Sequence, residues 1–470
     1  MEPRIRRTSL PTIISKGITM KSINPYTQEV QAEFEPYTMK LVDHKLQIAR
    51  TAQTQWKTVP IAERAQKMRR VGQLLRDNCD NYAKIMVEEM GKTITEAKAE
   101  ALKCATVCDF YADNAADFLK DEHIPTDFSQ SYITYEPLGL VFAIMPWNFP
   151  FWQVFRCAVP AICAGNACIL KHASNVPRCA LEIEKIFFEA GLAPGLFTTL
   201  LIGAKDAMKV IDEDKIDAVS LTGSNKAGEE VGALAGRRIK PMVLELGGSD
   251  PFIVLEDADI DKAVEAARQS RLINNGQSCI AAKRLIVRKE IAEEFTHKLI
   301  HSFKQLIVGD PMDPKTDIGP VAQEHFAKDL QAQIDDAKEK GATVESATVA
   351  SDTGWFIAPC VITGTTDQMR VISEEVFGPI APVIIAESDE EIIKIANNTE
   401  YGLGSSIWSK NIDRAVGIGN KIQTGTVAIN EFMKSNVSLP FGGTKKSGVG
   451  RELAYLGIRE FVNIKTVVVK

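Results

Sequence analysis

Residues 218–228 read AVSLTGSNKAG, an apolar run that ends in a turn with glycines five residues apart. Residues 218–221 have the length and apolar character of a buried strand, and the glycine at 223 followed by polar residues indicates the start of a helix. In such a strand–glycine–helix unit, backbone N–H groups at the helix N-terminus can contact a pyrophosphate. The stretch therefore predicts one unit of a parallel sheet, with Gly223 and Ser224 near a phosphate.

Short apolar runs alternate with helical stretches on both sides of this unit. This alternation predicts an α/β fold, with a doubly wound, Rossmann-type parallel sheet and then a separate α/β domain from residue 251 to about 429. Residues 39–118 carry apolar side chains at helical spacing and are expected to form helices that cover one face of a sheet. The predicted strands are residues 140–145, 167–170, 197–201, 218–221, 251–255, 284–287 and 382–385.

Composition excludes several classes of protein. The chain has 470 residues, 45% hydrophobic and 25% charged, with a net charge of −6, which is typical of a soluble multidomain protein without a surface for nucleic acid or anionic membranes. No apolar run approaches the roughly 20 residues that a membrane-spanning helix needs. Nine cysteines without a CxxC pair argue against structural zinc and fit reduced thiols in a cytoplasmic protein.

The first 19 residues contain four basic residues and a single acid. A basic, acid-poor segment is typical of a transit peptide. The sequence favours instead a flexible extension over residues 1–19, or a true start at Met20, because residues 20–25 read like the beginning of a folded enzyme.

Two short motifs carry the chemistry. Residues 245–248 (ELGG) follow an apolar run, and residues 276–279 (GQSC) form a polar, glycine-containing turn. A cysteine and a carboxylate in this setting suit attack of a thiol on a carbonyl, followed by hydrolysis of the thioester. Cys279 is therefore the candidate nucleophile and Glu245 the candidate base, although an isolated cysteine or glutamate would more often be a packing or capping residue.

From about residue 22 to the C-terminus, the chain resembles the aldehyde dehydrogenase superfamily. Six motifs occur in the order of that family, and they are MPWNFP at 145–150, ELGG at 245–248, GQSC at 276–279, EEVFGP at 374–379, NNTEYGL at 397–403 and PFGGTKKSG at 440–448. The resemblance implies oxidation of a small aldehyde with NADP, NAD or both, without a metal. Because Glu245 is present, it also implies release of the free acid.

The resemblance implies a domain organisation as well. It predicts a cofactor-binding domain at 20–126 and 139–246, a catalytic domain at 247–433, and a small β flap at 127–138 and 434–470. Residues 131–135 and 461–469 alternate polar and apolar side chains with no helix beside them, as strands of such a flap would. In the family this flap mediates oligomerisation, so a homodimer or homotetramer is expected.

Roles for individual residues follow from matched positions in the family. Asn148 would stabilise the oxyanion beside the backbone N–H of Cys279, although alone it would be taken for a turn former. Ser174 stands where NAD-specific relatives have a glutamate that repels the 2′-phosphate, so NADP is expected to bind, alone or with NAD. The residues expected at the cofactor are Met145, Pro146, Trp147, Lys171, Ser174, Gly223, Ser224, Leu246, Glu375 and Phe377.

Arg156 points to the substrate. An arginine eight residues after Asn148 resembles the succinate-semialdehyde dehydrogenases, especially their bacterial Sad-type branch, in which a cation receives the distal carboxylate. Ser435 matches a substrate-contacting serine of that branch, whereas its second arginine is replaced by Ile273. The residues expected to contact substrate are Arg156, Ser435, Phe149 and Gln153.

Four alternatives remain open at this stage. Arg156 could pair with a carboxylate of the protein. The substrate could be an aliphatic or aromatic aldehyde, held by an apolar tunnel. The chain could be a non-catalytic protein on the same scaffold, or a thiol hydrolase, which would not need Lys171, Glu375 and Phe377. The tunnel would be lined by Phe149, Trp152, Ile273, Ile280 and Phe432.

Overall fold

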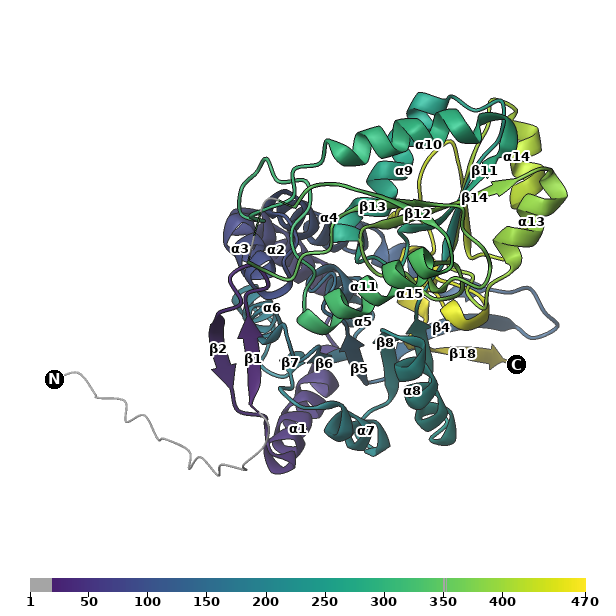
Figure 1. The fold of residues 1–470 in the computed structure, drawn as a ribbon. Helices are drawn as coiled ribbons and strands as arrows, with labels where there is room; N and C mark the ends of the chain where they lie inside the picture. The colour runs from purple at the N-terminus through teal and green to yellow at the C-terminus, as the bar shows by residue number, and fades with distance from the viewer. Residues whose placement is uncertain (1–18, 350, 352) are drawn as a thin grey trace.

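A computed structural model describes residues 19–349, 351 and 353–470. They form two large sheets with helices packed against them and two small sheets (Figure 1), so the predicted α/β class is confirmed. One small sheet is the antiparallel pair of β1 (Met20–Ile23) and β2 (Val30–Phe34). The expected extension over residues 1–19 falls outside the described residues except for residue 19.

The first large sheet has the strand order β17-β9-β8-β5-β6-β7. Its five longer strands are parallel, and only β17 runs antiparallel, beside β9. The parallel strands are almost entirely buried, because the crossover helices of parallel strands cover the sheet. The strands are β5 (Leu140–Met145), β6 (Ala167–His172), β7 (Phe197–Thr199), β8 (Ala218–Thr222), β9 (Met242–Glu245) and β17 (Gly448–Val449). The helices between them are α5 (Trp152–Cys163), α6 (Pro177–Glu189), α7 (Ala204–Asp212) and α8 (Asn225–Arg237).

The N-terminal helices form more than one layer. Of α1 (Met39–Trp56), α2 (Ile61–Asp77), α3 (Cys79–Met90) and α4 (Ile94–Phe118), only α1 packs on the strands of the first large sheet, against β5, β6 and β7. The other three pack mainly on one another and on α5 and α6. The expectation that the whole of 39–118 covers a sheet is therefore wrong. The reason is α5, which is buried along its entire length between the sheet and α4.

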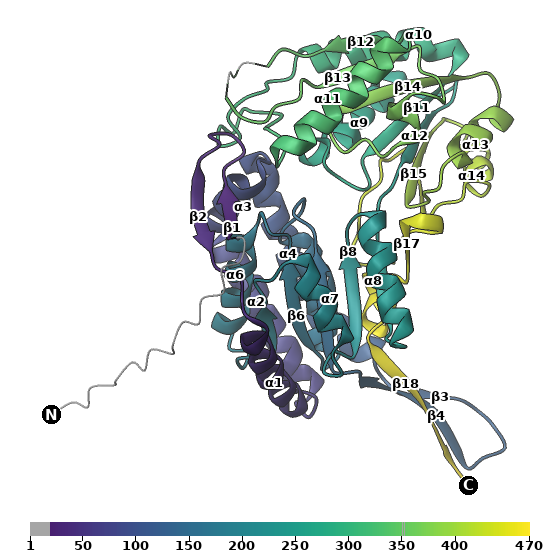
Figure 2. The ribbon, with the colours of Figure 1, turned by 60° about the horizontal axis from the view of Figure 1, so that its bottom comes forward.

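The second large sheet has the order β12-β13-β14-β11-β10-β15-β16, with only β12 antiparallel. It lies in the upper half of Figure 2. Its strands are β10 (Asp250–Val254), β11 (Ala282–Arg288), β12 (Thr343–Ser346), β13 (Cys360–Thr363), β14 (Ile380–Ala386), β15 (Gly404–Trp408) and β16 (Thr426–Ile429). The helices of this part and of the C-terminal region are α9 (Ile260–Leu272), α10 (Lys289–Lys304), α11 (Glu324–Glu339), α12 (Arg370–Ser373), α13 (Asp389–Asn397), α14 (Ile412–Gly419) and α15 (Ala454–Arg459).

A narrow ribbon of strands extends from the body of the molecule (Figure 2). It consists of β3 (Glu122–His123), β4 (Gln130–Pro137) and β18 (Val462–Val469), and β4 and β18 pair antiparallel over their full length. Part of the segment assigned to the flap lies elsewhere, because β17 completes the first large sheet. The division into domains stays a prediction.

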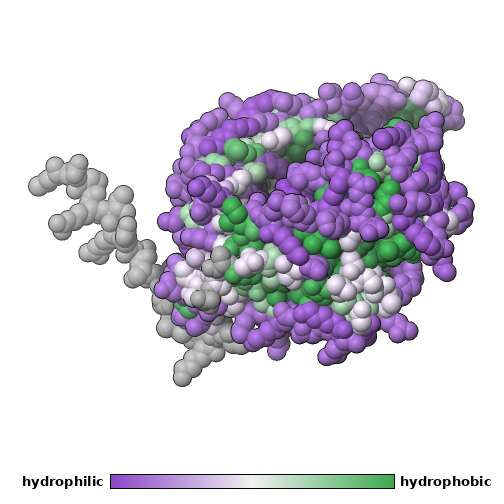
Figure 3. Space-filling view, turned by 45° about the horizontal axis from the view of Figure 1, so that its top comes forward, coloured by the Kyte–Doolittle hydropathy of each residue, from purple (hydrophilic) through white to green (hydrophobic). Residues whose placement is uncertain are grey.

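One face of the molecule is mainly hydrophilic. In the view of Figure 3, hydrophilic residues cover most of the face, and hydrophobic residues gather across its middle. Across the described residues, no helix combines the length and the apolar character needed to span a membrane. In the same part of the chain, no group of three or more His, Cys, Asp or Glu side chains is arranged to hold a metal ion.

Candidate active site

Two cavities meet at Cys279. The larger, of about 470 Å³, lies at the ends of β5, β6 and β8 and is lined by nearly all the residues predicted to bind cofactor. The smaller, of about 330 Å³, is lined by Arg156 and Ser435 together with the five residues of the predicted apolar tunnel, which include Phe149. Cys279 and Gln153 line both cavities. The structure thus places the candidate thiol where two separately bound molecules could meet.

The loop that presents Cys279 has an unusual backbone. Asn274 and Asn275 are consecutive residues in the left-handed region, with φ of 58° and 56°, a conformation that needs support from surrounding contacts. Hydrogen bonds from both side-chain amides to backbone carbonyls provide that support. Gly276 has φ of 75°, and a Cβ there would lie 2.4 Å from the carbonyl carbon of Gly378. The loop therefore requires glycine, and its position is fixed.

Asn148 is buried beside this loop. Its side-chain Nδ2 donates to the backbone carbonyl oxygen of Gln277 at 3.1 Å, and its backbone carbonyl oxygen accepts from Asn274 Nδ2 at 2.7 Å. Asn148 and Cys279 both line the larger cavity. These bonds hold the amide next to the cysteine loop, as the predicted oxyanion role requires, and one N–H of the amide is left for a ligand.

The Cys279 thiol is protonated in this state. Desolvation by the surrounding protein raises its pKa to about 12, although the positive charges of Lys283 and Arg156 act in the opposite direction. Lys283 Nζ donates to the Cys279 carbonyl at 2.6 Å and forms an ion pair with Glu375 at 3.1 Å. Because Glu375 partly neutralises Lys283, we expect the thiolate to form only when further positive charge approaches, as a bound nicotinamide ring would supply.

Glu245 ends β9 and is buried, and it lines neither cavity. Its Oε1 has no hydrogen-bond partner among the described residues. Burial, and then the negative charge of Glu452, raise its pKa well above the ordinary value. A carboxyl in these surroundings favours the protonated form. Glu245, the base predicted from sequence, therefore does not accept a proton in the observed conformation.

Arg156 has a carboxylate partner within the protein. Its Nε forms an ion pair with the buried Glu452, and Nη2 donates to Thr222 Oγ1 at 3.4 Å. The guanidinium lies 4.8 Å from the ring centroid of Phe441, at the wall of the smaller cavity. The pairing that the sequence left as an alternative is therefore observed, and Arg156 also lines the smaller cavity.

The larger cavity has the features of a phosphate site. Ser224 caps α8 by accepting from the Ala227 N–H at 3.4 Å, and the space around Gly223 is open. Gly228 allows α8 to pack against Leu246, the residue after β9, since a Cβ at position 228 would lie 2.5 Å from the Leu246 side chain. Lys171 lines the cleft with no carboxylate partner among the described residues. A helix N-terminus that lines the cavity beside an unpaired cation fits a dinucleotide phosphate.

The remaining predicted cofactor residues divide into two groups. Glu375 accepts from the Gly248 N–H at 3.0 Å, and Phe377 contacts Trp147 edge to face at 5.9 Å between ring centroids; all three side chains line the cleft. Ser174 does not line it, because it is exposed in the loop after β6, one residue beyond Ala173, which does.

Several residues at the site were not predicted, and three of them are charged groups that contact predicted site residues. They are Lys103 on α4, Lys283 on β11 and Glu452 before α15. A signal existed for Lys103, because Glu96, Glu100 and Lys103 follow helical spacing and so place charge on one face of α4. Charged residues on a helix face that must pack inward indicate a site. Glu452 gave no comparable signal.

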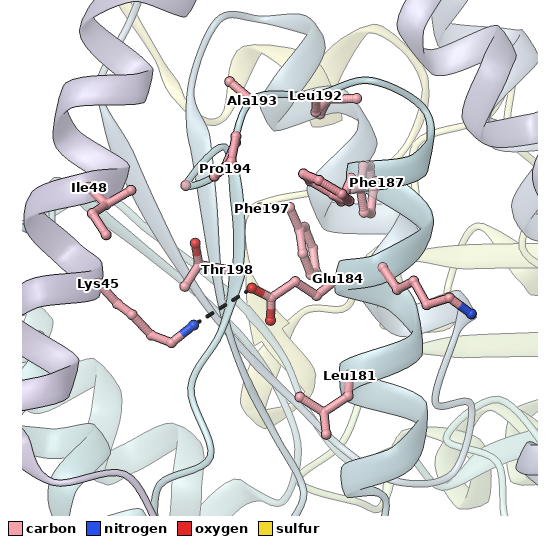
Figure 4. Close-up of a pocket in the computed structure, with 13 residues that line it drawn as sticks. Lys45, Ile48, Leu181, Glu184, Phe187, Leu192, Ala193, Pro194, Phe197 and Thr198 are labelled. Atoms are coloured by element: carbon pink, nitrogen blue, oxygen red, sulfur yellow. Dashed lines mark ion pairs between the residues drawn. The ribbon is translucent and has the colours of Figure 1, made fainter. Parts of the chain in front are cut away.

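Another cavity, of about 420 Å³, lies between α1 and α6 (Figure 4). Its lining is largely apolar and includes an ion pair of 3.7 Å between Lys45 and Glu184. It shares no lining residue with the two cavities at Cys279. None of the residues predicted from the motifs lies there.

Comparison with known proteins gives a consistent result. The aldehyde dehydrogenase family profile matches residues 13–467. The chain is 46% identical over 451 residues to a Synechocystis protein named probable succinate-semialdehyde dehydrogenase (NADP+), covering 96% of this chain and 99% of that protein. It is 46% identical over 453 residues to succinate-semialdehyde dehydrogenase (NADP+) of Mycobacterium avium, covering 95% and 96%. The crystal structure of succinic semialdehyde dehydrogenase from Streptococcus pyogenes in complex with NADP+ superimposes with a TM-score of 0.93 at 38% identity, covering 96% and 99%.

Proposed function

The chain belongs to the aldehyde dehydrogenase family, and we propose that it oxidises succinate semialdehyde to succinate with NADP as the preferred cofactor. The observation that carries this proposal is the position of Cys279 at the junction of two cavities, one suited to a dinucleotide and one with cations in its wall. The names of the relatives at 45–46% identity support both the substrate and the cofactor.

In the proposed mechanism, the Cys279 thiol releases its proton to solvent, and Sγ attacks the aldehyde carbon to form a thiohemiacetal. The side-chain amide of Asn148 and the Cys279 N–H hold the oxygen that becomes negative. Bound NADP supplies the acceptor for the hydride that leaves this carbon. Glu245, once ionised and turned toward Cys279, then takes a proton from water, which attacks the resulting thioester. The carbon–sulfur bond breaks, succinate departs, and the proton passes from Glu245 to Sγ, which restores the thiol of Cys279.

The main alternative is a dehydrogenase of neutral aldehydes. The apolar residues of the smaller cavity favour it, and so does the pairing of Arg156 with Glu452. The deciding measurement follows the absorbance of reduced cofactor with succinate semialdehyde and with pentanal, each with NAD and with NADP. We expect the highest kcat/KM with succinate semialdehyde and NADP. Faster oxidation of pentanal would contradict the substrate, and no reduction with either aldehyde would point to another aldehyde or to the non-catalytic alternative.

Ser174 is proposed to admit the 2′-phosphate of NADP. Replacement of Ser174 by glutamate should lower the ratio of kcat/KM for NADP to that for NAD by about 10- to 100-fold, because a carboxylate repels the phosphate. Ser174→Gln is the matched control, since it adds the same bulk without the charge. An unchanged ratio in Ser174→Glu would show that this loop does not contact the adenosine ribose.

We also propose that the protein forms a homodimer or homotetramer through the flap in the cytoplasm. The outer edge of β18 pairs with no other strand in the described part of the chain, and Ile464, Val468 and Val469 are exposed on it. Edge strands with apolar side chains commonly pair with another chain. All nine cysteines are free thiols, which supports a reducing compartment.

A further inference from the structure

We infer that Lys103 determines substrate specificity by binding the distal carboxylate of the substrate in the smaller cavity. This inference rests on the proposed function and adds a residue that no family motif indicates. Lys103 extends from α4 into the cavity wall, on the face that also carries Glu96 and Glu100.

The position of the ammonium group suits a carboxylate. Lys103 Nζ donates to Ser435 Oγ at 2.6 Å and lies 4.3 Å from the ring centroid of Trp152. Ser435 lines the same cavity and was predicted from the sequence to contact substrate. A lysine N–H and a serine hydroxyl that converge on one space can bind the two oxygens of a carboxylate.

Lys103 is the cation of this cavity that has no carboxylate partner within the described residues. Of the other two cations in the wall, Arg156 pairs with Glu452 and the exposed Lys434 pairs with Glu431 at 3.0 Å. A substrate carboxylate would therefore supply the missing negative charge at Lys103, whereas at Arg156 it would compete with Glu452.

The acidic side chains in the wall of the smaller cavity do not provide a carboxylate partner for Lys103. Glu100 forms an ion pair with the buried Lys92 and accepts from the N–H groups of Phe151 and Trp152. Glu96 accepts from the Asn274 N–H at 2.6 Å, and burial raises its pKa, which favours the neutral form. Both carboxyls are thus engaged by other groups, and neither forms an ion pair with Lys103.

The electrostatics at Lys103 favour binding of an anion. Burial, followed by the positive charge of Arg156, lowers the pKa of Lys103 to about 8. A buried ammonium without a counter-ion is costly, and binding of a carboxylate removes much of that cost. In the resembled branch a second arginine stands at the position of Ile273. Lys103 supplies a cation to the same cavity from α4, in place of that arginine.

The test is Lys103→Met, which keeps the length of the side chain and its helix propensity. We expect the KM for succinate semialdehyde to rise about 10- to 100-fold, as loss of a charged hydrogen bond would produce, while kcat changes little. The KM for pentanal should stay the same or fall. Lys103→Arg should restore most of the affinity for the semialdehyde. Lys98→Met, on the same helix but exposed and paired with Asp80, is the matched control and should behave as the wild type.

A second readout separates this inference from the proposed function. Succinate should inhibit pentanal oxidation by the wild type competitively with the aldehyde, and Lys103→Met should lose that inhibition. If the wild type does not prefer the semialdehyde, the proposed function fails, and the succinate measurement still decides the role of Lys103. If the wild type prefers it and Lys103→Met keeps both the preference and the inhibition, the inference is overturned. Should Lys103→Met fail to fold, Lys103→Gln carries the same comparisons.

Discussion

Replacement of Cys279 by alanine will abolish aldehyde oxidation with both cofactors and leave NADP binding intact. The proposed reaction passes through a bond to Sγ, so no other group can replace the thiol. Loss of kcat should be about 10⁴- to 10⁶-fold, as when the nucleophile of a covalent mechanism is removed. Initial rates give the loss of turnover, and titration calorimetry gives the dissociation constant of NADP.

The matched control for this variant is Cys79→Ala. Cys79 is also partly exposed, but it lies at the start of α3 and lines neither cavity at the site. It should retain wild-type rates. Dehydrogenase activity in Cys279→Ala would exclude the thioester mechanism, and loss of NADP binding would show that the loop, rather than the thiol alone, had been disturbed.

Glu245→Gln will stop the reaction after its first half. The glutamine cannot take a proton from water, so the thioester should accumulate after one equivalent of reduced cofactor has formed per site. The later steady rate should fall about 10²- to 10⁴-fold, the usual contribution of a general base. Stopped-flow absorbance shows the burst, and mass spectrometry of the quenched enzyme shows the added acyl group. A variant without a burst would place Glu245 before acyl formation.

The same variant should be more stable at neutral and alkaline pH. Because the pKa of Glu245 is raised in the folded protein, the unfolded chain releases the proton at a lower pH than the folded chain does. Stability therefore falls as pH rises above the ordinary glutamate value of about 4.5. Glutamine removes this loss, so the Tm of Glu245→Gln should exceed that of the wild type at pH 8, with the difference vanishing below about pH 4.5. An equal Tm at pH 8 would contradict the burial of an ionisable carboxyl.

The sequence predicted the core strands well, because buried parallel strands are short, apolar and bounded by turns. The predicted strand 140–145 coincides with β5, and 218–221 falls one residue short of the end of β8. The family resemblance grouped the motifs at 145–150, 276–279 and 374–379, and residues of all three line the larger cavity. The roles assigned to those residues stay predictions. Comparison with relatives confirmed the family.

Side-chain partners between distant segments were beyond the sequence. Periodicity identifies the inward face of α4 but not which residues meet it, so the contact of Lys103 with Ser435, 332 positions away, was not predicted. Nor could Glu452 be matched with Arg156, because no local pattern connects a C-terminal loop to α5. The layering of α2, α3 and α4 over α5 was missed for the same reason. The pattern of an amphipathic helix shows that its apolar face is covered, but it does not show which element covers that face.

The pairing of β17 with β9 has a consequence for how the molecule is made. β9 ends at Glu245, and its outer neighbour Gly448 is synthesised roughly 200 residues later, which takes about 10 to 40 s at about 5–20 residues per second. During that interval the outer edge of β9 is unpaired, and strands of other chains could pair with it. We therefore expect β9, the strand that bears the proposed base, to reach its native environment only when synthesis of the chain is nearly complete. The yield of folded protein should then fall as the concentration of incomplete chains rises.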